Sequence, residues 1–204
     1  MSTKGFTLIE TLVSVAVFSV VMVVTLGALL ALSSASRKAQ AISAAVNNIS
    51  FALDSMTRAI RTGTQYHCGT GGTLTSPADC PTPPGDTYFT FLDTNGNQVA
   101  YCVANAVLYR YVGSPGSPPT TCDTTTGFVP LTSPEISIAN FAFYVVGSVA
   151  TGGGDTIQPK VTILLSGYEA TKGKAPTIAS CNTGEIVCAI FNLQTSVTQR
   201  IYDI

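Results

Sequence analysis

The sequence contains few charged residues. Only 10% of its 204 residues are Asp, Glu, Lys or Arg, and the 10 basic residues nearly balance the 11 acidic ones. About a quarter of the residues are charged in an average soluble protein. Binding to nucleic acid through phosphate contacts requires clustered Lys and Arg, and the sequence contains no such cluster. We therefore expect no direct binding to nucleic acid.

Histidine is almost absent, because His67 is the only one. Ser-His-Asp or Cys-His catalysis would have to use it, and no CxxC pair is present to build a zinc site around it. The sequence also lacks a G-x-S-x-G elbow, an H-E-x-x-H motif and a glycine-rich loop that ends in Lys-Ser or Lys-Thr. Gly152-Gly153-Gly154-Asp155 has no such lysine and indicates a turn. We expect no enzymatic activity, no cofactor and no metal site, and we interpret His67 as a loop residue.

What the sequence does contain is an apolar run from Thr11 to Leu32 without a single charge. At about 1.5 Å per helical residue this run would reach roughly 33 Å, enough to cross a hydrocarbon core of about 30 Å. It exceeds the apolar region of a secretory signal peptide, which is about 7 to 15 residues long. Glu10 lies at the head of the run, where a carboxylate carried to the bilayer centre costs about 2.5 to 3.5 kcal/mol. Glu10 is therefore expected to have a partner of opposite charge.

The residues around Glu10, Lys4-Gly5-Phe6-Thr7-Leu8-Ile9-Glu10, resemble the processing site of type IV prepilins and of the pseudopilins of type II secretion. The resemblance implies that a prepilin peptidase cuts after Gly5 and that the same enzyme N-methylates the new terminal amine of Phe6. Glu10 then becomes the fifth residue and neutralises the amine of a neighbouring subunit. Two buried opposite charges are tolerable only as a pair, which agrees with this role.

The resemblance also implies partners and a location. The partners are other pilins or pseudopilins through the N-terminal helix, the peptidase, an inner-membrane assembly platform and, before assembly, membrane lipid. The chain would cross the inner membrane once with its N-terminus in the cytoplasm and end in an extracytoplasmic fibre. The alternative is a membrane-anchored extracytoplasmic binding module or adhesin that keeps its leader and never polymerises.

Beyond the apolar run the pattern predicts a continuing amphipathic helix that ends at Gly63. Its apolar residues recur at steps of four and three on one face. Asp54 and Arg58 are spaced to form an ion pair on the polar face. The stripe is expected to pack on a sheet, with a two-stranded coiled coil as the alternative. The stripe residues are Ala35, Ala39, Ile42, Val46, Ile49, Leu53, Met56 and Ile60.

The rest of the chain alternates between β-type runs and loops rich in Gly, Pro, Ser and Thr. A tight Ala104-Asn105 turn would join two of the strands. The turn Asp93-Thr94-Asn95-Gly96-Asn97 is a hairpin signal, and calcium is the alternative interpretation, although the distal glutamate of an EF-hand is missing. Strands are predicted at 87–92, 98–103, 106–112, 135–146, 156–168 and 186–204, and loops at 64–86, 113–126 and 171–184.

Together these elements predict an α+β fold in which one long N-terminal helix packs on an antiparallel β-sheet, as the resemblance to type IV pilins also implies. We divide the chain into a leader (1–5), a transmembrane and assembly helix (6–32), an amphipathic helix (33–63) and a β-rich domain with disulfides (64–204). Three further features resemble the larger minor subunits, the J class of pseudopilins and the W class of minor pilins. They are Leu53, Arg58 and Arg61 near the helix end, the hairpin with Val99-Ala100-Tyr101 and Leu108-Tyr109-Arg110, and the terminal Leu193-Gln194-Thr195-Ser196-Val197 through Arg200. This implies a minor subunit of a type IV pilus, a competence pseudopilus or a type II secretion pseudopilus, at or near the fibre tip.

All six cysteines follow the apolar run, which indicates disulfides in an oxidising compartment and so places the leader in the cytoplasm. Pairing between neighbours in the sequence is expected. The pairs would be Cys68 with Cys80, Cys102 with Cys122, and Cys181 with Cys188.

Overall fold

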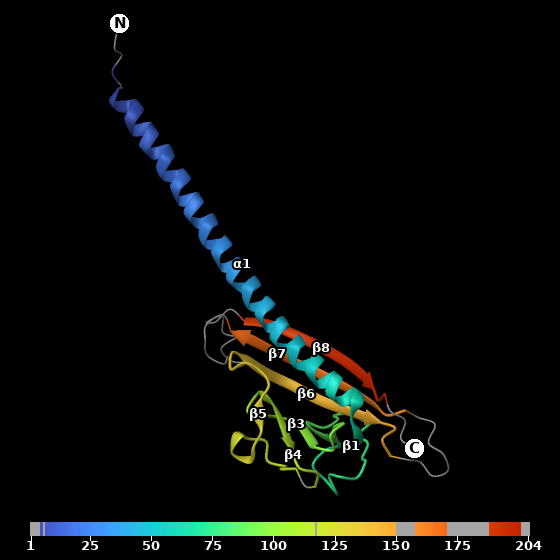
Figure 1. Cartoon of the computed structure of the whole chain (residues 1–204). Helices are drawn as coiled ribbons and strands as arrows, with labels where there is room; N and C mark the ends of the chain where they lie inside the picture. Colours follow the sequence, from blue (N-terminus) through green and yellow to red (C-terminus); the bar gives the residue numbers. More distant parts are fainter. Residues whose placement is uncertain (1–4, 6, 117, 150–157, 171–187, 201–204) are drawn as a thin grey trace. The chain divides into compact units, whose positions relative to one another are not determined.

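The computed structural model describes residues 5, 7–116, 118–149, 158–170 and 188–200. The chain divides into two compact units, Met1–Gln40 and Ala41–Ile204. Helix α1 (Leu8–Thr62) supplies nearly all of the first unit and the beginning of the second. The second unit adds eight strands and a short 3-10 helix among the described residues (Figure 1).

The strands form two antiparallel sheets, and in each the spatial order follows the chain order, so each sheet is a meander. The structure therefore confirms the α+β fold, with two sheets where one was predicted. The 3-10 helix η1 (Thr124–Thr126) precedes the last strand of the first sheet. The first sheet contains β1 (Thr64–Cys68), β2 (Tyr88–Leu92), β3 (Gln98–Ala104), β4 (Val107–Gly113) and β5 (Val129–Pro130). The second contains β6 (Ile136–Val146), β7 (Lys160–Ala170) and β8 (Cys188–Thr198).

In the second unit, α1 packs across the second sheet (Figure 1), as the predicted amphipathic pattern requires. The buried face differs from the predicted stripe, however. Ile42 and Val46 are 41% and 39% exposed, and Ala41 and Ala45 are buried in their place. Small side chains let a helix backbone approach its neighbour closely, which explains why alanines face the sheet here. The buried residues of α1 are Ala41, Ala45, Ile49, Ala52, Met56 and Ile60.

The core between the helix and the sheets is aromatic. The ring centroid of Phe89 lies 5.7 Å from that of Tyr66 and 5.1 Å from that of Phe143, so residues from β1, β2 and β6 meet there. Val161, Ile163 and Leu165 of β7 are buried on the helix-facing side of the second sheet. One continuous core thus joins the helix to both sheets.

The C-terminal end of α1 is bonded to the end of β8. The amide of Arg200 donates to the carbonyl oxygen of Arg61 at 2.8 Å, and the side chain of Gln199 donates to the carbonyl oxygen of Gly63 at 3.1 Å. Tyr66 donates its hydroxyl to the carbonyl oxygen of Ile60. The last carbonyls of a helix lack partners within the helix, so these bonds allow the helix to end inside the protein.

Gly63 follows the last residue of α1, where the helix was predicted to stop. A Cβ atom at this position would overlap the ring of Phe91. The close approach of Phe91 requires a glycine here.

Gly63→Ala should therefore destabilise the second unit by about 1 to 3 kcal/mol, because the ring of Phe91 must move within a packed core. Chemical unfolding of the full chain measures the effect. Gly71→Ala is the matched control, since a Cβ there would meet nothing within 4 Å. Equal stability of the two variants would contradict the packing argument.

The predicted loop 64–86 is wrong at its start, because Thr64–Cys68 forms β1 and pairs with β2. His67 is accordingly a strand residue with 2% exposure. Its ring nitrogens lie 2.6 Å from the carbonyl oxygen of Ser76 and 2.9 Å from that of Gly71. His67 thus holds the segment that follows β1 against the strand.

Two turns decide the register of the first sheet. Asn105 and Ala106, with φ of 51° and 63°, form the turn between β3 and β4, so the predicted Ala104-Asn105 turn is displaced by one residue. The reason is that Ala104 remains in the ladder opposite Val107. In the other turn, both carboxylate oxygens of Asp93 accept hydrogen bonds from Asn95 or Asn97. Turn chemistry therefore accounts for Asp93 without a metal.

The two long predicted strands at the end of the chain are shorter in the structure. β7 begins at Lys160 and ends at Ala170, whereas 156–168 was predicted. β8 ends at Thr198, and Gln199 already bonds to Pro159 and Gly63 in place of a neighbouring strand. Three of the predicted features lie outside the described residues. They are the Gly152–Gly154 turn, the whole 171–184 loop and the ends of both predicted strands at 156–157, 186–187 and 201–204.

Disulfides link Cys68 to Cys80 and Cys102 to Cys122, with Cα atoms 5.8 Å and 6.1 Å apart. These are two of the three expected pairs. Cys181 lies outside the described residues, so its expected pairing with Cys188 remains a prediction. The first bridge ties β1 to the segment that lies beside β6, and the second ties β3 to the loop before η1.

We expect that substitution of Cys102 and Cys122 together by Ser lowers the free energy of unfolding by about 3 kcal/mol, the value for a loop of this length. Denaturant unfolding of the full chain measures the loss. Peptide mapping without reduction should find the two bridges described and a third between Cys181 and Cys188. A different connectivity would contradict the prediction.

Candidate functional site

The candidate site is the beginning of α1. Thr7 precedes the helix, and its hydroxyl oxygen accepts a hydrogen bond from the amide of Glu10 at 3.4 Å. The carbonyl oxygen of Thr7 accepts from the amides of Glu10 and Thr11. Thr7-Leu8-Ile9-Glu10 therefore has the spacing of a capping box, which stabilises the start of a helix. Thr7 is not among the site residues predicted from the sequence, although the Thr-x-x-Glu pattern could have revealed it.

Gly5 lies before the helix and is exposed. A Cβ atom at Gly5 would meet nothing within 4 Å. The fold of the described chain therefore places no steric demand for glycine at this position. If glycine is required there, the requirement comes from a molecule that binds this segment. Phe6 lies outside the described residues.

In the apolar part of α1, the hydroxyl side chains form hydrogen bonds within the helix itself. The hydroxyls of Thr11, Ser14 and Ser19 donate to carbonyl oxygens three or four residues earlier, at 2.7 to 2.9 Å. Thr25 and Ser34 do the same. Hydroxyls bonded in this way need no water, so they are compatible with lipid or with a dry bundle of helices.

Glu10 is the exception on this surface. Its carboxylate makes no hydrogen bond or ion pair with any residue that the structure describes, and its neighbours Leu8 and Ile9 are 80% and 67% exposed. A carboxylate in the first turn interacts favourably with the helix dipole, but this contributes only about 0.3 to 1 kcal/mol. Burial of this apolar surface would leave Glu10 needing a positive partner from another molecule.

The remaining candidate residues lie elsewhere. The described cysteines belong to the second unit, and Gly5 and Glu10 to the first, so the processing and assembly residues share one short segment without the cysteines. Among the described residues, no group of three or more His, Cys, Asp and Glu side chains could hold a metal ion.

A second carboxylate, that of Glu169 on β7, is also relevant because its side chain is buried in the second unit. Its side chain is 5% exposed, and its Oε2 has no hydrogen-bond partner among the described residues. Burial raises the pKa of Glu169, and the carboxylate of Glu135 raises it further, while a hydrogen bond from the Ala45 backbone opposes the shift. Folding therefore favours the protonated form of Glu169.

A raised pKa contributes stability below the unfolded value, and this contribution is lost as the pH rises through the folded value. Glu169→Gln should accordingly raise the melting temperature at pH 7 and reduce its fall between acidic and neutral pH. Thermal unfolding of both proteins at several pH values measures this. Glu135→Gln is the control, because it removes only the neighbouring charge and should have the smaller effect. A lower melting temperature for Glu169→Gln at pH 7 would contradict the argument.

Comparison with known proteins agrees with this placement of the site. Residues 1–26 match the family model described as the prokaryotic N-terminal methylation motif. No curated protein and no solved structure matches the chain. The matched residues include Gly5, Thr7 and Glu10 and the first part of the apolar helix.

The chain is thus an α+β protein whose N-terminal helix is long and apolar enough to cross a membrane and begins with a methylation motif. These features support a type IV pilin-like protein and favour the role of a structural subunit. Assembly with other pilins and processing by a peptidase follow in general from the motif, and anchoring in the inner membrane before assembly fits the apolar helix.

Proposed function

We propose that the chain is a minor pilin or minor pseudopilin, a structural subunit of a type IV pilus, a competence pseudopilus or a type II secretion pseudopilus. A prepilin peptidase cuts after Gly5 and methylates the amine of Phe6. Before assembly, the apolar helix anchors the subunit in the inner membrane, with the N-terminus in the cytoplasm. It then enters an extracytoplasmic fibre with the help of an inner-membrane assembly platform.

The observation that carries the proposal is the isolated carboxylate of Glu10 beside an apolar run whose hydroxyls, those of Thr11, Ser14, Ser19 and Thr25, all bond to carbonyl oxygens of the same helix. A helix that served only as an anchor would gain little from a charge at this point, because lipid offers no partner of opposite charge and the helix dipole contributes only about 0.3 to 1 kcal/mol. In a bundle of identical or similar helices, the amine of Phe6 on a neighbour supplies the positive charge. The motif match supports the same interpretation.

A position at or near the fibre tip is the finer part of the proposal. The support comes from the two described disulfides and the long connections between strands, which give the second unit large loops. Such loops fit more easily at the end of a fibre than between the closely packed subunits of its shaft. The division into a leader (1–5), an assembly helix (6–32), an amphipathic helix (33–63) and a β-rich domain (64–204) belongs to this proposal.

A second candidate function is a membrane-anchored extracytoplasmic binding module that does not polymerise. The second sheet carries a trough on the face turned away from α1. This observation favours the second candidate, because a subunit can bind a ligand on such a surface without entering a fibre.

Mass spectrometry of the N-terminus in the native host tests the proposal. A methylated Phe6 supports a fibre subunit, while a retained Met1 or Ser2 overturns the proposal and leaves the anchored module. Isolation of sheared fibres that contain the chain distinguishes a polymerised subunit from one that is processed but remains in the membrane.

A further inference from the structure

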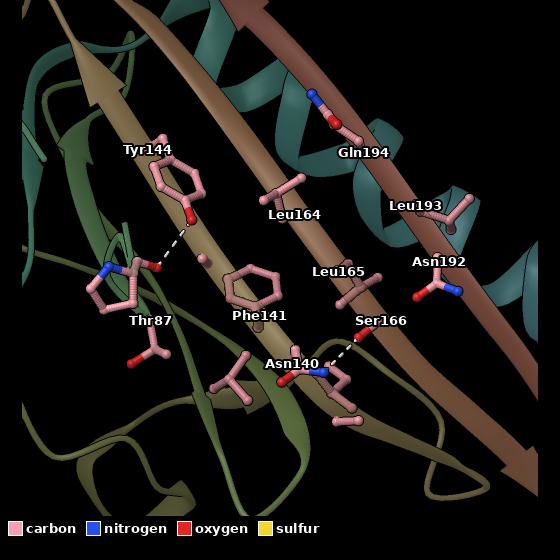
Figure 2. Close-up of a pocket in the computed structure, with 15 residues that line it drawn as sticks. Thr87, Asn140, Phe141, Tyr144, Leu164, Leu165, Ser166, Asn192, Leu193 and Gln194 are labelled. Carbon is pink, nitrogen blue, oxygen red and sulfur yellow. Dashed lines mark hydrogen bonds between the residues drawn. The ribbon is translucent and has the colours of Figure 1, made fainter. Parts of the chain in front are cut away.

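The outer face of the second sheet, turned away from α1, carries a trough of about 810 Å³ (Figure 2). Its floor comes from β6, β7 and β8, and one wall comes from the segment around Pro84. A volume of this size falls in the range of ligand sites, about 300 to 1,000 Å³. The trough lies entirely in the second unit, far along the chain from Gly5 and Glu10.

Side chains cross the floor in rows set by strand register. Asn140 lies opposite Ser166, which lies opposite Asn192, so an amide, a hydroxyl and an amide form one row. The next row contains Ala142, Leu164 and Gln194. Figure 2 shows the labelled members of both rows, Asn140, Ser166, Asn192, Leu164 and Gln194, on the same face of the sheet. The floor is therefore an apolar strip bordered by amides.

The wall of the trough is held in place. Tyr144 donates its hydroxyl to the carbonyl oxygen of Pro84 at 3.3 Å (Figure 2), and this bond fixes the ring beside the floor. Asp86 and Phe143 exchange backbone hydrogen bonds of 3.1 and 2.7 Å, which attach the wall segment to β6. A site whose walls are already fixed loses little entropy when a ligand binds.

The polar groups of the floor have unused hydrogen-bonding capacity. Asn140 donates to the hydroxyl of Ser166 at 3.0 Å, which leaves its carbonyl oxygen available. Asn192 and Gln194 are exposed and make no hydrogen bond with any residue that the structure describes. Each amide group offers two donors and one acceptor. The trough can therefore bind a ligand that carries both donors and acceptors.

The charge of the residues that line the trough limits the class of ligand that can bind. All the lining residues that the structure describes are uncharged, so an anionic ligand such as a phosphate or a carboxylate would find no cation among them. A sugar ring matches the surface that is present, because it has apolar C–H faces for Leu164 and Tyr144 and hydroxyls at its edge for the amides.

We propose that this trough is a binding site for a neutral oligosaccharide of hexose units. One ring lies over the strip formed by Ala142 and Leu164 against Tyr144, and its hydroxyls bond to Asn140, Asn192 and Gln194. The proposal does not depend on fibre assembly, because none of these residues belongs to the first unit.

To test this proposal, the full chain is placed in phosphatidylcholine nanodiscs without sugar-based detergents. It is then applied to an array of neutral and anionic oligosaccharides that covers the common hexose linkages. The neutral compound that binds best is then titrated by calorimetry. Asn192→Ala combined with Gln194→Ala should weaken its binding about tenfold or more, since two hydrogen bonds are lost. Asn47→Ala is the matched control, because Asn47 is an exposed amide on α1 outside the trough.

Saturable binding of a neutral oligosaccharide that the double variant weakens and the control preserves supports the site. Binding by none of the neutral oligosaccharides, or binding that the double variant leaves unchanged, overturns it. A double variant that lowers incorporation into fibres, without any oligosaccharide binding, would instead assign the trough to contact with another subunit. Glu10→Ala should bind the oligosaccharide normally, so this result separates the site from the proposed assembly function.

Discussion

Glu10→Ala should be cut and methylated normally but enter fibres poorly. In the proposed bundle the carboxylate of Glu10 would face the amine of Phe6 on another subunit, and removal of one partner of a buried pair costs about 3 to 5 kcal/mol. The helix start should survive, because Thr7 still caps it through the amide at position 10. Loss of the charge also favours lipid, so the mature variant should accumulate in the membrane.

The measurement is the amount of the chain in sheared fibres relative to membranes of the native host. Glu10→Gln keeps the size of the side chain and should fail like Glu10→Ala, which assigns the effect to charge. Ser14→Ala is the control on the same helix, since the Ser14 hydroxyl bonds only to a carbonyl oxygen of its own helix. Incorporation of Glu10→Ala at the wild-type level would contradict the charge pair and leave the processing site intact.

Gly5→Val should block processing and leave the full-length precursor in the membrane. A branched side chain does not fit where a peptidase accepts a residue without a Cβ atom. The structure sharpens this expectation, because a Cβ at Gly5 meets nothing within 4 Å. A failure of processing would therefore arise in the complex with the peptidase and not from misfolding of the chain.

Immunoblotting separates precursor from mature chain by size, and mass spectrometry identifies the terminus. Gly27→Val is the matched control, since Gly27 also has nothing within 4 Å and lies inside the helix, beyond the motif. Its processing should be normal. Cleavage of Gly5→Val after residue 5 would count against recognition of this segment by a prepilin peptidase.

The sequence predicts the periodic elements of the fold well, because their signals are local. Helix α1 ends within one residue of Gly63, and β2, β3 and β6 lie close to their predicted bounds. The Asp54 and Arg58 pair also forms, at 2.9 Å. Charges, periodicity and turn residues act over a few positions, so a single chain reveals them.

The errors come from interactions between distant segments. Ala41 and Ala45 carry little hydrophobic signal, and only the approach of the sheet decides that they are buried in place of Ile42 and Val46. β1 and the two-residue β5 exist because β2 and β4 offer them unpaired edges. The trough could not be anticipated either, since Asn140, Ser166 and Asn192 are brought together only by strand register.

The bonds between the end of α1 and the end of β8 have a consequence for the order of folding. Arg61 and Gly63 receive their partners from Arg200 and Gln199, so the helix cannot complete its contacts until nearly the whole chain has been synthesised. At about 5 to 20 residues per second, this delay is on the order of ten seconds. The disulfides span only 12 and 20 residues and can close earlier. The first sheet can thus form first. The apolar face of the helix remains exposed, and therefore accessible to chaperones, until β6, β7 and β8 have been synthesised and cover it.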